Sequence, residues 1–143
     1  MSSQYIPAAR AEHCTARRDI RTQALVGPVS NATTVPPTIG LAEFITQTIK
    51  VTPRDVLVVK MDIEGAEYET IDALIAARAH ELVDEIFIEV HYKHRRMDQL
   101  YKWCVPNRNQ RVAPHWCSLY KLEDAARLLN RLRSLGVYAH AWP

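Results

Sequence analysis

A short acidic sequence follows an apolar segment near the middle of the chain. Residues 56–61 are apolar except for Lys60, and the residues that come directly after them include Asp62, Glu64 and Gly65. β-Branched residues without alternation are typical of an interior parallel strand. Ligands of α/β folds bind at the carboxyl ends of such strands. We therefore expect carboxylates at the rim of a parallel sheet, where they can accept a proton, bind an amino group or hold a hard cation.

A second segment with the same character carries Glu89 and His91. Residues 85–92 read as a strand in which 86, 88 and 90 point one way and 85, 87, 89 and 91 the other. Parallel strands joined by a right-handed crossover often lie side by side. Their carboxyl ends would then meet at one edge of the sheet. The predicted catalytic residues are Asp62, Glu64, Glu89 and His91, and those predicted to bind a cofactor are Lys60, Asp62 and Gly65.

The same acidic residues have a purely structural interpretation. Asp62 could cap a following helix, and Glu64 and Glu67 could complement the helix dipole. Gly65 could serve only close packing at the turn. Lys60 favours a functional site, because a lysine in an otherwise apolar buried strand is costly unless it is paired.

The histidines and cysteines of the second half do not form a recognisable metal motif. The spacings of His91 with His94 and of His115 with Cys117 match no tight zinc pattern, and Cys104 stands alone between them. No metal is therefore predicted. The chain also has no Gly-x-Ser-x-Gly motif, so a serine hydrolase is not supported.

The bulk composition fits one globular domain. With 143 residues and a net charge of +2, the chain is large enough for a core and too weakly charged to indicate nucleic-acid or membrane binding. No apolar stretch approaches the roughly 20 residues of a membrane-spanning helix. Three cysteines without a Cys-x-x-Cys pair favour free thiols in a reducing compartment, so a cytoplasmic location is the default expectation.

Hydrophobic periodicity predicts the elements that position the acidic residues. Residues 1–39 read as an irregular lead-in, with a possible short strand at Leu25. The elements predicted after it are a helix of about ten residues from Leu41, a strand at 55–61, a helix at 64–78, a strand at 85–92, a long loop at 93–115, an amphipathic helix at 119–135 and a strand at 137–142. The stripe of the last helix is assigned to Leu122, Leu129 and Leu132, and Gly136 to its end. This order predicts an α/β fold with helices packed on a sheet.

The acidic sequence resembles a known family signature. Lys60, Asp62, Glu64, Gly65 and Glu67 match the Lys-x-Asp-x-Glu-Gly-x-Glu signature of FkbM-like S-adenosylmethionine-dependent methyltransferases. Residues 83–92 are similar to the next strand of a plant and algal branch, and the resemblance covers residues 40–143. It implies a partial Rossmann-like methyltransferase sheet with three or more mostly parallel strands. It also implies methyl transfer from S-adenosylmethionine to an acceptor, often a hydroxyl of a small molecule or glycan.

One departure from the family pattern concerns glycine. The chain has four glycines and none of them form a Gly-x-Gly, whereas such domains bind the donor through a glycine-rich turn. Residues 40–143 are therefore expected to be the carboxyl-terminal part of a methyltransferase-like domain, with residues 1–39 either an irregular lead-in or a remnant of the missing amino-terminal half. The alternative function is a truncated, non-catalytic module for binding or assembly, with self-association through an exposed sheet edge.

Overall fold

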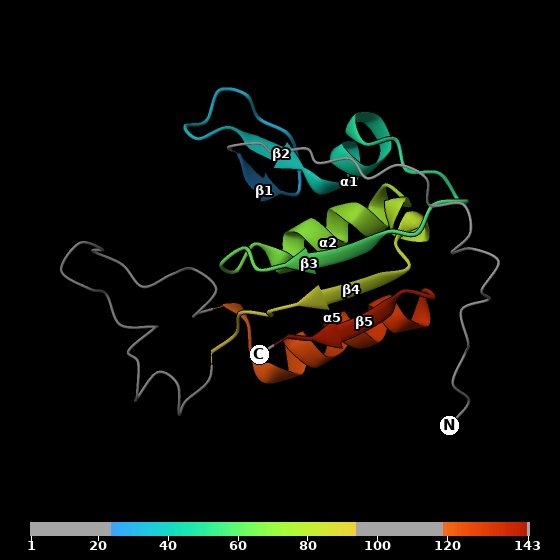
Figure 1. Ribbon diagram of the computed structural model, residues 1–143. Helices are drawn as coiled ribbons and strands as arrows, with labels where there is room; N and C mark the ends of the chain where they lie inside the picture. Colours follow the sequence, from blue (N-terminus) through green and yellow to red (C-terminus); the bar gives the residue numbers. More distant parts are fainter. Residues whose placement is uncertain (1–23, 94–118, 143) are drawn as a thin grey trace.

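The computed structural model describes residues 24–93 and 119–142, which form an α/β fold with two parallel sheets (Figure 1). The larger sheet has the order β3-β4-β5. Its strands are β3 (Val58–Met61), β4 (Glu85–Ile88) and β5 (Tyr138–Ala141). The smaller sheet pairs β1 (Leu25–Gly27) with β2 (Thr38–Gly40). The predicted class, a partial Rossmann-like sheet with parallel strands and flanking helices, is confirmed.

The two strands that carry the acidic residues lie side by side, as predicted. β3 pairs with β4 in parallel, and Met61 lies opposite Ile88. Both strands are shorter than the sequence predicts. β4 ends at Ile88 because its neighbours end at the same level: the Glu89 N–H donates to the Met61 carbonyl at 2.9 Å, and the Trp142 N–H donates to the Ile88 carbonyl at 2.7 Å. The chain therefore leaves the ladder just before the residues of interest.

Helices connect the strands, and the two long helices pack on the larger sheet. α1 (Leu41–Glu43) continues into a π-helical turn η2 (Phe44–Thr48), and α2 (Glu67–Ala76) is followed by a 3₁₀ turn η3 (Ala79–Leu82). The last helix, α5 (Leu122–Ser134), precedes β5. At its start the Lys121 N–H donates to the Asp124 carboxylate at 2.8 Å, a capping bond that fixes where the helix begins.

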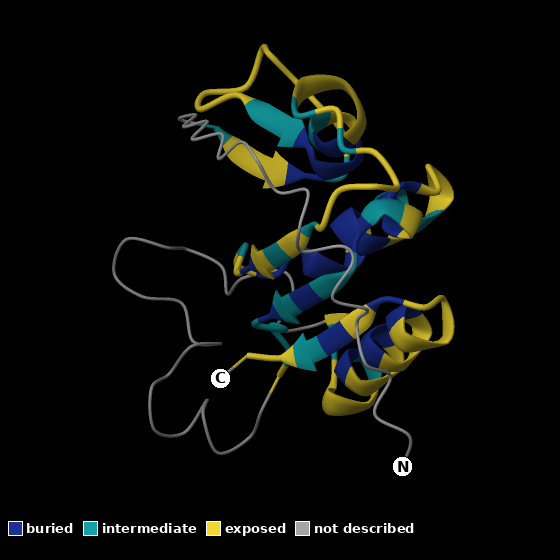
Figure 2. Ribbon diagram, turned by 45° about the vertical axis from the view of Figure 1, so that its right-hand side comes forward, coloured by how far each residue is buried: buried dark blue, intermediate teal, exposed yellow. Residues whose placement is uncertain are grey.

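The core lies on one face of the larger sheet, between the strands and the two long helices (Figure 2). Ile86 and Ile88 are fully buried there. The buried residues of α2 include Tyr68, Ile71 and Leu74, and those of α5 are Ala125, Leu128, Leu129 and Leu132. Burial of these apolar side chains is the main driving force that holds the helices on the sheet. The strand ends are therefore fixed by a packed scaffold.

Two predictions about individual side chains were wrong. Leu122 is 55% exposed, and Leu128 takes its place on the buried stripe of α5, because the helix begins only at Leu122 and turns that residue outward. Lys60 does not lie in a buried position. It lies on the face of the sheet opposite the core, is exposed, and its Nζ lies 4.5 Å from the centre of the Trp142 ring.

Gly136, the strand at Leu25 and the loop after residue 92 are the remaining features predicted from the sequence. Gly136 has a φ of 92°, which favours glycine, and it follows the end of α5 as predicted. The predicted short strand at Leu25 is confirmed as β1. The predicted loop at 93–115 lies, apart from its first residue, outside the described residues. Within the described parts of the chain, no helix has the length and apolar character needed to cross a membrane.

Candidate functional site

The connection between β3 and α2 is a tight turn that places two carboxylates at the sheet edge. Glu64 and Gly65 both have positive φ, 56° and 97°, so the chain reverses within two residues. A positive φ is uncommon for a residue other than glycine, and it turns the Glu64 side chain outward from the strand. The turn thus exposes Asp62 and Glu64, while α2 begins two residues later.

Glu67, in the first turn of α2, holds this connection from inside. Its Oε1 accepts hydrogen bonds from the backbone N–H of Ile63 at 3.0 Å and of Gly65 at 3.2 Å. The side chain is 0% exposed. A buried carboxylate is stable only when its charge is compensated by donors of this kind. Glu67 is therefore the internal anchor of the turn.

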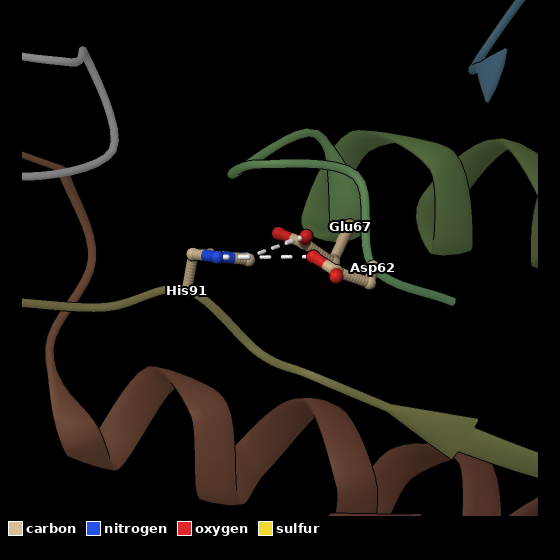
Figure 3. A group of neighbouring side chains, drawn as sticks. All are labelled: Asp62, Glu67 and His91. Atoms are coloured by element: carbon tan, nitrogen blue, oxygen red, sulfur yellow. Dashed lines mark hydrogen bonds and ion pairs between the residues drawn. The ribbon is translucent and has the colours of Figure 1, made fainter. Parts of the chain in front are cut away.

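The same oxygen of Glu67 also binds His91, which follows β4. Nδ1 of His91 lies 2.9 Å from Glu67 Oε1 (Figure 3). On the other side of the ring, Nε2 lies 3.6 Å from Glu64 Oε2, 3.9 Å from Glu89 Oε1 and 4.0 Å from Asp62 Oδ1. Four carboxylates from three parts of the chain thus surround one imidazole.

Burial decreases from the base of this cluster to its mouth. The His91 side chain is 10% exposed, whereas those of Glu89, Asp62 and Glu64 are 36%, 47% and 83% exposed. Glu67 lies at the base, and its Oε2 has no hydrogen-bond partner among the residues that the structure describes. Solvent therefore reaches the cluster from the side of the three outer carboxylates.

The protonation of the pair is fixed by its surroundings. Burial alone would raise the pKa of Glu67, but the hydrogen bonds from His91 and from backbone N–H groups outweigh it and lower that pKa. The pKa of His91 is raised, first by the hydrogen bond to Glu67, against the opposing effect of burial, and further by the charges of Glu67, Glu64 and Glu89. Glu67 is thus held as a carboxylate that can only accept hydrogen bonds.

The structure brings together four of the residues singled out from the sequence, Asp62, Glu64, Glu89 and His91. Gly65 lies in the turn, where its N–H is used by Glu67. Lys60 lies on the opposite side of the sheet from the core, over Trp142, and is not part of the cluster. Glu67 was predicted only to complement the helix dipole. Glu67 follows Asp62 by five residues and lies in the first helical turn after the strand. This position could have indicated that its side chain reaches the end of the next strand.

A cation site at the same place is geometrically possible. Asp62, Glu67 and His91 each offer one ligand atom, and these atoms lie within 4.8 Å of one another. However, Glu67 Oε1 already accepts three hydrogen bonds, one of them from His91. A cation bound through Oε1 would have to displace these donors, whereas Oε2 has no hydrogen-bond partner among the described residues. The expectation that the site holds no metal stays a prediction.

Ligands of Rossmann-like α/β folds bind at the carboxyl ends of adjacent parallel strands, so the cluster is a candidate site of this class. The chain belongs to the methyltransferase FkbM domain family, whose model matches residues 3–136. The match includes the amino-terminal residues that the resemblance over 40–143 left out. No curated protein and no solved structure matches the chain.

Proposed function

We propose that this protein transfers a methyl group from S-adenosylmethionine to a hydroxyl group of a small molecule or glycan. Family membership supports methyltransferase activity as a class. The observation that carries the proposal further is the convergence of His91 with Asp62, Glu64 and Glu89 at the ends of β3 and β4. This cluster can bind a polar acceptor and accept its proton at the edge of the sheet where ligands of the class bind.

His91 is the residue best placed to accept the proton of the acceptor. Its Nδ1 is engaged by Glu67, and its Nε2 lies 3.6–4.0 Å from the three outer carboxylates. As the hydroxyl oxygen forms its bond to the methyl carbon, the bond between that carbon and sulfur breaks, and the hydroxyl proton passes to Nε2. The outer carboxylates stabilise the imidazolium that results, because each lies within 4.0 Å of Nε2.

The methyl donor needs a binding partner for its charged amino acid portion. S-adenosylmethionine supplies a methyl group on a positively charged sulfur. Asp62, half exposed at the mouth of the cluster, is the carboxylate we assign to the donor's ammonium group. Lys60 and Gly65 were also expected to bind the donor, but Lys60 lies over Trp142 and the Gly65 N–H is bound by Glu67. The proposed donor contact therefore depends on Asp62.

The proposal is tested with the purified chain, S-adenosylmethionine and a panel of sugars, phenols and aliphatic alcohols. Formation of S-adenosylhomocysteine and the mass of the methylated product are measured. We expect turnover, and a loss of about 10²- to 10⁴-fold in kcat for His91→Asn, the range typical of a lost general base. His140→Asn is the matched control, because His140 lies on β5 near Glu85, apart from the cluster. Full activity of His91→Asn would remove His91 from the reaction.

The second candidate function is a non-catalytic binding or assembly module. The absence of any Gly-x-Gly in the chain favours it. Titration of the chain with S-adenosylhomocysteine by calorimetry separates the two. Binding at millimolar or lower concentration supports the methyltransferase, and no detectable heat supports the module.

A further inference from the structure

We propose that Glu67 is a positioning residue that fixes the proton of neutral His91 on Nδ1 and so directs the lone pair of Nε2 toward the acceptor. The inference rests on the proposed function for its catalytic meaning. Its structural content, the tautomer of His91, can be measured without substrate. The sequence motif contains Glu67, but only the fold shows that it reaches across from α2 to the end of the next strand.

The hydrogen-bond pattern around Glu67 determines the tautomer. Glu67 Oε1 already accepts from the Ile63 and Gly65 N–H groups, which only an oxygen lone pair can satisfy. A carboxylate has no proton to donate, so the contact of 2.9 Å to Nδ1 requires that the proton be on the nitrogen. In a neutral imidazole the other nitrogen is then the acceptor. Nε2 is the nitrogen that lies near the carboxylates of Glu64, Glu89 and Asp62.

One oxygen atom also couples the turn to the histidine. The Oε1 atom that binds His91 holds the backbone on both sides of Glu64 through the N–H groups of Ile63 and Gly65. A shift of Glu67 would therefore move the outer carboxylates and the imidazole relative to each other. Reacting groups lose efficiency steeply with such displacements, because catalysis depends on their alignment. Glu67 thus acts on the reaction through His91 and the turn, without a contact to substrate.

Within residues 24–93 and 119–142, the charges that face His91 come from three parts of the chain. Glu67 lies on α2, Asp62 and Glu64 on the turn after β3, and Glu89 just after β4. Replacing Glu67 by glutamine keeps an oxygen acceptor and removes one negative charge. Glu67→Gln should therefore preserve the Nδ1–H tautomer and shift the titration of His91 to lower pH. If the Glu67 carboxylate did not contact Nδ1 in solution, the titration would not change.

The experiment is a nitrogen-15 and carbon-13 NMR titration of the His91 ring in the full chain. We expect the Nδ1–H tautomer above the transition in the parent protein and in Glu67→Gln, with the transition of Glu67→Gln at lower pH. Glu69→Gln, an exposed position on the same helix, is the matched control and should titrate like the parent. A dominant Nε2–H tautomer in the parent, or an unchanged transition in Glu67→Gln, would overturn the inference.

Activity supplies a second readout that does not depend on the NMR result. We expect Glu67→Leu to lose about 10- to 100-fold in kcat, with a smaller effect on the acceptor KM, because the imidazole is no longer aligned. The acid limb of the pH profile of Glu67→Gln should move to lower pH along with the His91 transition. If the parent shows the Nδ1–H tautomer and no turnover, the proposed function fails while the role of Glu67 in the fold stands. If the parent turns over and neither variant changes kcat or the profile, the positioning role fails alone.

Discussion

Replacement of Glu67 by leucine should destabilise the fold far more than replacement by glutamine. Leucine has a similar size but no acceptor, so the buried N–H groups of Ile63 and Gly65 lose their partner. Each unsatisfied buried donor costs about 1–3 kcal/mol, which gives roughly 2–6 kcal/mol for the pair. The better burial of an apolar side chain offsets part of this cost, and we expect a net loss of about 3–4 kcal/mol.

Glutamine provides the comparison that isolates the hydrogen bonds. It keeps an oxygen in the place of Glu67 Oε1 and loses only the charge, so the expected loss is about 1–2 kcal/mol, the difference between charged and neutral hydrogen bonds. Glu69→Gln, exposed on the same helix, should stay within about 0.5 kcal/mol of the parent.

The assay is urea unfolding of the three variants, followed by far-UV circular dichroism at neutral pH. The free energies of unfolding are compared at equal m values, which ensures that the same transition is observed. A free energy of Glu67→Leu within about 1 kcal/mol of Glu67→Gln would contradict the reasoning, since it would mean that the turn does not depend on its buried acceptor.

The Glu67–His91 pair, the exposed Glu64 and the core leucine Leu132 each lead to a further prediction. The Glu67–His91 pair should stabilise the fold most between pH 4.5 and 6.5. The lowered pKa of Glu67 gives stability above 4.5 that is lost as pH falls through its folded pKa, and the raised pKa of His91 gives stability below 6.5 that is lost as pH rises through its folded pKa. Urea unfolding of the parent and His91→Asn inside this window and on both sides of it tests the prediction, and an equal difference between the two proteins at every pH would contradict it. Glu64→Gln, at the exposed mouth, should lower the KM of anionic acceptors and raise that of cationic acceptors by about two- to fivefold in steady-state assays, and equal effects on both would contradict the proposed acidic mouth. Leu132→Ala in the core should cost about 2–5 kcal/mol, whereas exposed Leu122→Ala should cost well under half of that, as thermal unfolding can show.

Much of the fold follows from hydrophobic pattern alone. The apolar runs around Val59 and Ile86 predicted two parallel strands, and right-handed crossover predicted that they pair, as they do. Strand ends were less predictable. The sequence around Glu89 continues to alternate, but the paired register ends at Ile88, opposite the last residues of both neighbouring strands. The length of a strand depends on the strands that it pairs with, and its own sequence does not determine where those strands end.

The candidate site shows the same limit. The residue types of Asp62, Glu64, Glu89 and His91 and their positions after two strands predicted that they meet. The buried role of Glu67 did not follow, because the positive φ of Glu64 and Gly65, which turns α2 back over the strand end, is a property of the folded turn. For Lys60 the sequence was misleading in the opposite direction. It was expected to be paired in a buried strand, but it lies exposed on the face of the sheet away from the core.

The most direct test of the proposed methyl transfer, and of His91 as its base, follows a labelled methyl group. The parent chain, His91→Asn and His140→Asn would be incubated with S-adenosylmethionine labelled in its methyl group and an alcohol or sugar acceptor, and label in the acceptor would be counted. We expect incorporation by the parent and by His140→Asn and a loss of about 100-fold or more for His91→Asn. Equal incorporation by all three proteins, or none by the parent, would contradict it.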